Sequence, residues 1–356
     1  MMTTNDFETC IIGQGLAGTT LAWALNRTGQ RVAIIDRDEQ FTSSRIAAGL
    51  ITPVTGKRFV KSWHFDEFWP AAVEFYRSIE AETEAEFFTQ KNSVRLFANR
   101  EEQELFNNKA NRDFPELVHS SEKLINESCF DAPDGGFEMV SAARLNVARY
   151  LDVSREAFTR QECHFIADID PNTDLQLEDN AVAIPTIGVK AQKVIFCQGF
   201  SGANNPWFQA VPFDSAKGEI LTVRIPGFNE QRTVHRGVWL AAIGDDLYRL
   251  GATYDREHLD CTPTTAGRDE LCSRLKKNLR VPFEVVEHNA AVRPIIVGRK
   301  PAIGFHPQFP QLGYFNGLGS KGSLQAPWLA EHFASVISGN TTLLPDLDVS
   351  RHFNRP

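Results

Sequence analysis

Near the start of the chain the spacing of the apolar positions changes from that of a strand to that of a helix and back to that of a strand. A run rich in β-branched residues, Thr9–Ile12, predicts a buried strand, and Leu16–Thr28 places its apolar residues at helical spacing. Arg31–Asp36 is again rich in β-branched residues and predicts a second strand. Strand, helix and strand in this order predict a βαβ unit with parallel strands.

Two later passages continue the alternating pattern. The apolar segment Lys193–Cys197 predicts a strand that ends at Gln198 and Gly199. Glycine-rich residues 316–322 precede a helix predicted over Ala326–Ile337. Both passages resemble the first one in pattern, so we expect all three to belong to one nucleotide-binding domain.

Stretches of different character separate these passages. Helical periodicity covers Phe65–Ala85, whereas alternating patterns at Gly218–Arg224 and Leu247–Thr253 predict an antiparallel sheet. The sequence therefore predicts an α/β protein, α+β overall, with a discontinuous Rossmann-like domain and an interleaved antiparallel-sheet domain for substrate. The predicted nucleotide domain comprises residues 1–60, 140–205 and 288–356, and the predicted substrate domain comprises residues 61–139 and 206–287.

The turn after the first predicted strand has the pattern of a dinucleotide site. Gly13 permits a tight turn, Gly15 lets the backbone approach a pyrophosphate, and Gly18 lets the helix pack closely on the strand. Asp36 ends the second predicted strand, eighteen positions beyond Gly18 (36 minus 18), where a carboxylate meets a ribose hydroxyl. NAD and FAD both remain candidates, because an acid at this position disfavours only a 2′-phosphate.

Composition narrows the class of protein. The 356 residues are 42% hydrophobic and 23% charged, with a net charge of −8, which is typical of a globular protein and argues against a surface that mainly binds polyanions. Six cysteines show no metal-ligand spacing, and we expect neither a metal site nor a membrane span. Met1–Glu8 lacks a basic region, so we expect no secretory signal and a cytoplasmic protein.

Several motifs along the chain resemble those of the D-amino-acid oxidase and glycine oxidase family of FAD-dependent enzymes. Phe41–Pro53 resembles the second flavin-contacting segment of that family, and Val292–Pro294 and Pro301–Gly304 resemble its later motifs. The glycine-rich turn before Ala326 and Pro327 is similar to that of the FAD domain of MnmC enzymes, which modify the wobble uridine of tRNA, with Lys321 in place of an arginine.

The resemblance implies non-covalent FAD, because Ile295–Lys300 contains no thiol where some relatives attach the flavin through cysteine. It also implies hydride transfer from a substrate carbon to flavin. The residues expected to contact FAD are Gly13, Gly15, Leu16, Ala17, Gly18, Asp36, Arg37, Ser43, Ser44, Ala48, Gly49, Leu50, Cys197, Gly199, Gly319, Ser320, Lys321, Gly322 and Ser323.

Three residues are expected to act in catalysis by the same resemblance. Arg293 matches an arginine that binds the substrate carboxylate, although a structural ion pair, Arg299 or Lys57 remain alternatives. Lys321 would stabilise the reduced flavin, unless it is a solvated surface lysine. Trp239 falls where glycine oxidases have a substrate-contacting tyrosine, but a tryptophan on a strand is more often in the core.

The function stays open between related alternatives. The leading hypothesis is an oxidase or dehydrogenase that acts on a small amine or amino acid. A second is MnmC-like oxidation of a carboxymethylaminomethyl group on tRNA, which the acidic net charge disfavours. A third is a flavin-binding redox protein without catalysis. An NAD-dependent dehydrogenase would share Gly13 to Asp36 but would leave the glycine-rich turn at 317–322 unexplained.

Overall fold

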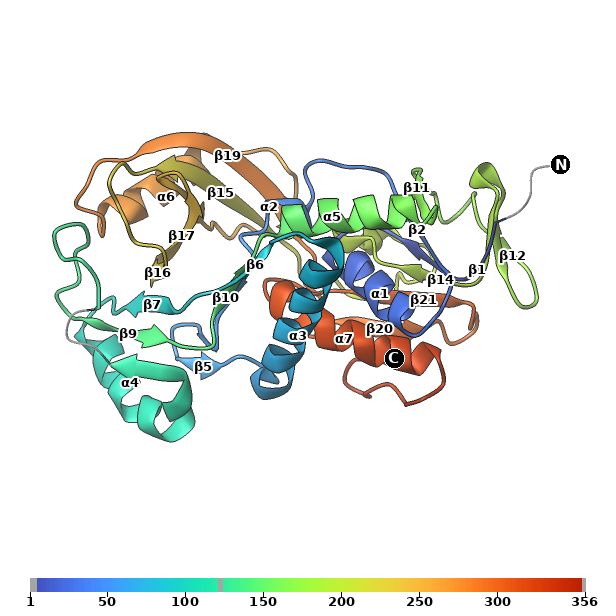
Figure 1. Ribbon diagram of the computed structural model, residues 1–356, viewed down its shortest axis with the longest axis horizontal. Coiled ribbons are helices and arrows are strands. Elements are labelled where there is room, and N and C mark those ends of the chain that lie inside the picture. Colours follow the sequence, from blue (N-terminus) through green and yellow to red (C-terminus); the bar gives the residue numbers. More distant parts are fainter. Residues whose placement is uncertain (1–4, 121–123, 354–356) are drawn as a thin grey trace.

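The computed structural model describes residues 5–120 and 124–353, and it has two large sheets side by side (Figure 1). Residues 1–4, half of the segment on which the prediction of no secretory signal rests, lie outside the described residues. The first sheet has the parallel order β11-β2-β1-β14-β21, continued by antiparallel β20, while β13 and β12 extend it beside the first half of β14. Its strands are β1 (Asn5–Ile12), β2 (Val32–Asp36), β11 (His164–Ile166), β12 (Gln176–Leu177), β13 (Val182–Ile184), β14 (Val189–Phe196), β20 (Ala302–Phe305) and β21 (Leu312–Asn316).

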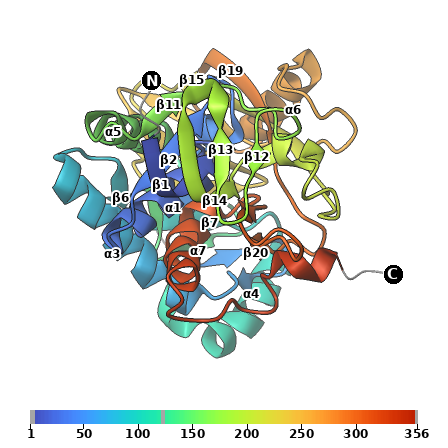
Figure 2. The same cartoon turned by 90° about the vertical axis from the view of Figure 1, so that its right-hand side faces the viewer.

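The predicted βαβ unit is present at the centre of this sheet. β1 pairs in parallel with β2 on one side and with β14 on the other, so all three strands end at the same edge. Helix α1 (Leu16–Arg27) connects β1 to β2 and packs against α7 (Gly322–Ile337), and α5 (Val147–Arg160) precedes β11. Figure 2 looks along the molecule at the strands β1, β2 and β14 with α7 beneath them. The fold class predicted from sequence is confirmed.

Helix α7 begins earlier than predicted, at Gly322 instead of Ala326. Pro327 therefore lies inside the helix, where it has no N–H to donate to the carbonyl of Ser323. That carbonyl instead accepts a hydrogen bond of 3.0 Å from the Tyr76 hydroxyl. Because this partner replaces the missing backbone bond, the helix passes through the proline and starts directly at the glycine-rich turn.

The second sheet is mixed and has the order β19-β15-β18-β17-β16-β7-β9-β8. Apolar residues on one face, such as Leu221, Tyr248 and Leu250, pack against α6 (Thr265–Lys276). The opposite face turns toward the first sheet. The strands of this sheet are β7 (Ser93–Leu96), β8 (Val118–Ser120), β9 (Gly136–Met139), β15 (Ala216–Arg224), β16 (Thr233–Arg236), β17 (Val238–Gly244), β18 (Leu247–Gly251) and β19 (Glu284–Arg293).

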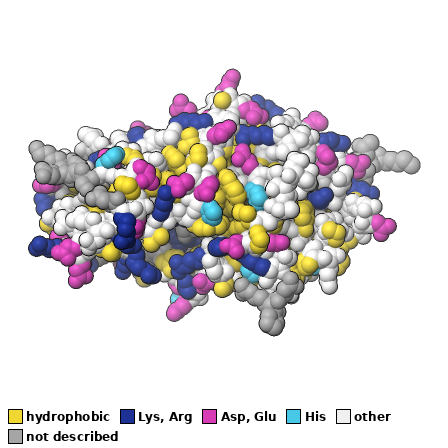
Figure 3. Space-filling view, turned by 90° about the horizontal axis from the view of Figure 1, so that it is seen from below, with side chains coloured by type: hydrophobic (Ala, Val, Ile, Leu, Met, Phe, Trp, Pro, Cys, Tyr) yellow, Lys and Arg dark blue, Asp and Glu magenta, His cyan; other side chains and the backbone are white. Residues whose placement is uncertain are grey.

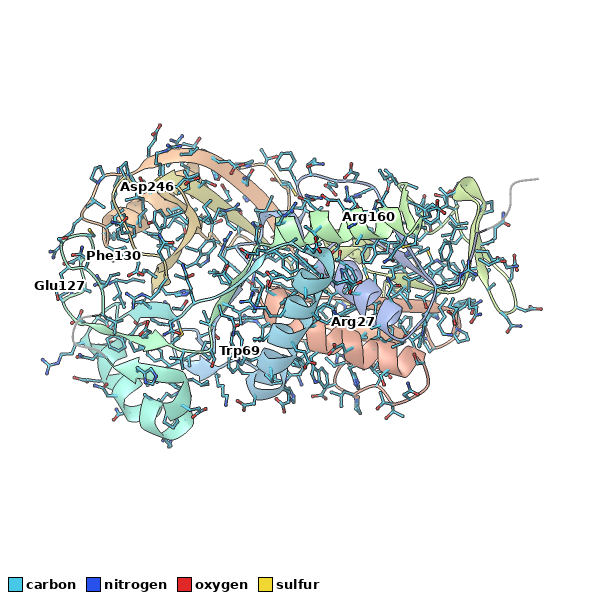
Figure 4. All side chains as sticks on the ribbon, in the orientation of Figure 1. Arg27, Trp69, Glu127, Phe130, Arg160 and Asp246 are labelled. Atoms are coloured by element: carbon cyan, nitrogen blue, oxygen red, sulfur yellow. The ribbon has the colours of Figure 1, made fainter. Side chains whose placement is uncertain are left out.

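Helix α3 (Phe65–Thr83) packs against α7 of the nucleotide-binding unit. Figure 4 labels Arg27 at the end of α1 and Trp69 on α3, and the Arg27 guanidinium lies 4.7 Å from the ring centre of Phe75 on α3. Where the two domains divide remains a prediction. The remaining elements are α2 (Ser43–Ile46), α4 (Arg100–Asp113), β3 (Leu50–Ile51), β4 (Val54–Thr55), β5 (Val60–Lys61), β6 (Phe88–Gln90) and β10 (Ala143–Leu145).

Within the described ranges, no helix is long and apolar enough to cross a membrane. The same residues contain no group of three or more histidine, cysteine, aspartate or glutamate side chains arranged to hold a metal ion. All six cysteines are free thiols.

Candidate active site

A cavity of about 870 Å³ lies between the carboxyl ends of the parallel strands and the open face of the second sheet. One half is lined by the glycine turn after β1, the segment from Phe41 to Leu50, residues 197–201 and the turn before α7. The other half is lined by residues of β7, β15, β16, β17, β18 and β19. Ligands of open parallel sheets bind at this edge, so the cavity lies where the predicted cofactor and substrate sites were expected.

The glycine turn has no room for side chains. A Cβ at Gly13 would lie 2.5 Å from the carbonyl oxygen of Cys197, and one at Gly18 would lie 1.9 Å from the carbonyl oxygen of Gly13. Gly13 also has φ +107, a left-handed conformation that favours glycine. Gly15 is the N-cap of α1 and has no side chain of its own, and the small Ser44 hydroxyl accepts a hydrogen bond from the N–H of Leu16. The positive end of α1 therefore opens on the cavity without a bulky neighbour.

Asp36 is held at the end of β2, beside this turn. Its carboxylate accepts hydrogen bonds from the backbone N–H of Gln14 at 2.7 Å and of Asp38 at 2.9 Å. Arg155 lies 3.3 Å from the same carboxylate and also pairs with Asp38. Oδ1 already accepts from two donors but Oδ2 from only one, so Asp36 is oriented and Oδ2 can still accept from a ribose.

The segment from Phe41 to Leu50 lines the cavity, and its contact with the flavin stays a prediction. Ser44 Oγ accepts a hydrogen bond of 3.0 Å from the backbone N–H of Leu16, which joins this segment to the start of α1. Gly49 has φ +71, and a Cβ there would lie 1.8 Å from the carbonyl oxygen of Leu145. Of the predicted contact residues in this part, Arg37, Ser43, Ser44, Ala48, Gly49 and Leu50 all line the cavity.

The turn before α7 brings a second helix N-terminus to the same cavity. Gly319, Ser320, Gly322 and Ser323 line it, and the N-cap of the helix is Lys321, whose side chain makes no capping hydrogen bond within the described chain. Two helix N-termini and a row of backbone N–H groups suit the phosphates and the electron-rich edge of a flavin dinucleotide. The residues present therefore fit FAD.

Lys321 itself does not line the cavity, in contrast to its neighbours. Its Nζ lies 3.4 Å from Thr52 Oγ1, and burial lowers the pKa of the ammonium group to about 8. It is consequently not a fully solvated surface lysine, which was the alternative reading. Its role toward the flavin stays a prediction. Gly18 likewise does not line the cavity, since it serves the contact between α1 and β1.

Arg293 lines the cavity at the end of β19. Its guanidinium covers Gly218 and contacts the carbonyl oxygens of Lys217 and Thr253 at long distances of 3.4 Å. Burial lowers the pKa of Arg293, and the ring of Tyr254 lies 5.7 Å away. No carboxylate of residues 5–120 or 124–353 forms an ion pair with it. The guanidinium is thus charged, half-buried and open to the cavity.

Trp239 also lines the cavity and is not enclosed in the core. Its indole lies against Gly251, where an added Cβ would come within 2.4 Å of the ring. The glycine therefore makes room for the tryptophan. Of the two alternatives to Arg293, Lys57 lines the cavity and Arg299 does not.

Among the cavity residues that the sequence analysis missed are Arg95, His235 and Tyr254. Tyr254 directly follows the motif that ends at Thr253, which was the only signal available in the sequence. Arg95 and His235 lie opposite each other on β7 and β16, far apart in the chain. Only the pairing of those strands brings them together.

The fold and the cavity are those of a dinucleotide-binding protein. Residues 8–336 match the DAO family model, described as FAD dependent oxidoreductase, and the chain belongs to this family. It is 24% identical to the uncharacterized oxidoreductase YurR of Bacillus subtilis (strain 168) across 96% of both chains, and 24% identical to glycine oxidase of Bacillus licheniformis across 94% of both. Glycine oxidase from Bacillus cereus ATCC 14579 has a similar structure, with a TM-score of 0.81 at 18% identity over 94% of this chain and 96% of that one.

Membership of this family decides between the two dinucleotides left open by the glycine turn. The cofactor is FAD. The comparisons do not extend to an MnmC-like ending, which remains an interpretation of the turn from Gly317 to Pro327.

Proposed function

We propose that this protein oxidises the carbon–nitrogen bond of a small amine or amino acid. The observation that carries the proposal is the Arg293 guanidinium, a half-buried cation at the cavity without a carboxylate partner in the described chain. A buried charge without a partner is costly, and an α-carboxylate would supply a bidentate one. The similarity to a glycine oxidase supports the same proposal.

The residues of the chain have separable roles in this proposal. Arg293 binds the substrate carboxylate and thereby fixes the position of the neighbouring carbon. Trp239 limits the space beside it, while Tyr254 covers the guanidinium from the solvent side. FAD, when bound, supplies the hydride acceptor. The N-terminus of α7 and Lys321 stabilise negative charge on the turn side of the cavity.

The experiment is an anaerobic titration of the FAD-loaded protein with glycine, sarcosine, D-amino acids, L-proline and carboxymethylaminomethyl-uridine, followed by flavin absorbance. We expect bleaching with at least one amine. Arg293→Lys should raise the substrate concentration needed for half-reduction, since lysine cannot replace a bidentate fork. Arg299→Lys is the matched control, because Arg299 is exposed and lies outside the cavity. Equal behaviour of the two variants would remove Arg293 from the mechanism.

One observation favours a second candidate, the oxidation of a carboxymethylaminomethyl group on tRNA. Ser320, which lines the cavity at the turn before α7, adds no positive charge to that of Arg293, so a free glycine would be held less firmly than by two arginines. The net charge of −8 opposes this candidate. Salt-sensitive binding of tRNA together with bleaching only by the modified uridine would establish it. A yellow protein that no amine reduces would instead be a flavin-binding protein without this catalysis.

A further inference from the structure

The cavity continues beyond Trp239, across β16 to β7. Gly251, Trp239, His235 and Arg95 lie opposite one another on the adjacent strands β18, β17, β16 and β7. Three strand spacings of about 4.8 Å separate the first from the last, roughly 14 Å in all. We call the far end of the cavity, lined by Gly56, Lys57, Arg95, Ala98, Glu102 and His235, the distal lobe.

The distal lobe carries an excess of positive charge. The Arg95 guanidinium is fixed by the carbonyl oxygen of Gly56 at 2.9 Å, by Glu102 at 3.4 Å and by the ring of Phe59, whose centre is 4.4 Å away. Lys57 is exposed and forms no ion pair within the described part of the chain. Two cations therefore face one carboxylate. Figure 3, a view from below, shows several lysine and arginine side chains close together in the half of the molecule that holds the second sheet.

His235 adds a buried polar group without a partner. Its Nε2 atom is shielded from solvent and, among the described residues, makes no hydrogen bond. Burial, Arg95 and Lys321 together lower the pKa of His235 to about 3, so the imidazole is neutral and has one N–H to donate. Native structures seldom leave such an atom unsatisfied, and a ligand in the lobe would satisfy it.

We propose that the distal lobe binds a second anionic group of the substrate, so that the substrate is an amino acid or secondary amine with two acidic ends. The inference rests on the proposed function, in which Arg293 holds the carboxylate next to the reacting amine. Arg293 and Arg95 lie on opposite sides of Trp239 in the sheet. Their separation favours acidic ends with several methylene groups between them over a substrate as small as glycine.

The test uses binding of unreactive ligands to the FAD-loaded protein. Linear dicarboxylates from malonate to suberate are compared with the monocarboxylates of equal length, by calorimetry and by the shift in flavin absorbance. We expect one dicarboxylate length to bind at least tenfold more tightly than its monocarboxylate, as for one additional charge-assisted hydrogen bond. Lys57→Ala should remove most of this gain. The matched control is Arg58→Ala, which deletes the neighbouring exposed cation outside the cavity.

The outcomes separate this inference from the proposed function. Flavin bleaching by amines, with no preference for dicarboxylates, would overturn the two-ended substrate and leave the oxidase intact. A dicarboxylate preference that depends on Lys57, without bleaching by any amine, would support the anion site and overturn the oxidase. Salt-sensitive binding of tRNA that Lys57→Ala weakens, again without a dicarboxylate preference, would overturn the inference in favour of a nucleic-acid phosphate in the lobe.

Discussion

Replacing Gly218 with alanine should displace the Arg293 guanidinium from its position while the arginine itself is unchanged. A Cβ at position 218 would lie 2.0 Å from Nη2 and 2.3 Å from Cζ of Arg293, well inside contact distance. The backbone of Gly218 is not in the left-handed region, so alanine fits the strand and only the guanidinium must move. The substitution is therefore a displacement of one side chain by about the width of a methyl group.

The expected loss follows from the hydrogen bonds that a displaced guanidinium cannot make. A hydrogen bond to a charged group contributes about 1.5–3 kcal/mol, so losing one to two of them raises the free energy of the bound carboxylate by about 3 kcal/mol. At 1.36 kcal/mol per factor of ten, kcat/KM for an amino acid should fall by about 150-fold. The free energy of unfolding should change by less than about 1 kcal/mol, because glycine to alanine also restricts the unfolded chain.

The assay compares kcat/KM for an amino acid with kcat/KM for the corresponding amine that lacks the carboxylate, at full FAD occupancy. Only kcat/KM for the amino acid should fall. The double variant with Arg293→Met is the control: if alanine acts through the guanidinium, it should cost little more once the arginine is gone. A Gly218→Ala enzyme that folds, binds FAD and keeps kcat/KM for the amino acid within twofold would refute the reasoning.

Three further predictions concern the cofactor half of the cavity. In the folded apoprotein the pKa of Lys321 is about 8, below its ordinary value. Above pH 8 only the unfolded chain holds this proton, so the free energy of unfolding should rise with pH. Denaturant titrations between pH 7 and 10 measure this rise, and Lys321→Met should remove it. Gly18→Ala should lower stability by about 1–3 kcal/mol, with loss of FAD, because its Cβ meets the Gly13 carbonyl; unchanged Tm and flavin content would contradict this. Acid precipitation should release all FAD into the supernatant, because the buried Cys197 thiol has a raised pKa, stays protonated and does not attach the flavin. Flavin in the pellet would contradict this and would indicate a bond to Cys197 or Cys261, the two thiols at the cavity.

The half of the cavity that belongs to the nucleotide-binding unit could be predicted from local sequence patterns. The turn from Gly13 to Gly18 and Asp36 belong to one βαβ unit, so their spacing in sequence fixes their spacing in the fold. The start of α7 was predicted four residues late because a proline usually marks the first turn of a helix. Only the hydrogen bond from Tyr76, on a helix far away in the sequence, explains why Pro327 is tolerated inside α7.

The half of the cavity lined by the second sheet depends on contacts that no local pattern encodes. The position of Arg293 follows from the pairing of β19 with β15, which puts Gly218 directly beneath the guanidinium. Arg95 could not be predicted, because it reaches the cavity beside His235 only through the pairing of β7 with β16. Periodicity predicts that such strands exist, but their register and neighbours are set by the packing of the whole sheet.

The parallel pairing of β7 with β16 also constrains how the chain can be made. During synthesis β7, β8 and β9 leave the ribosome long before β16, and until then β7 has an unpaired edge. The second sheet can be completed only when β19 has emerged, shortly before the last strands of the first sheet. Folding of this protein should therefore be slow and largely post-translational, and truncated nascent chains should be substrates for chaperones.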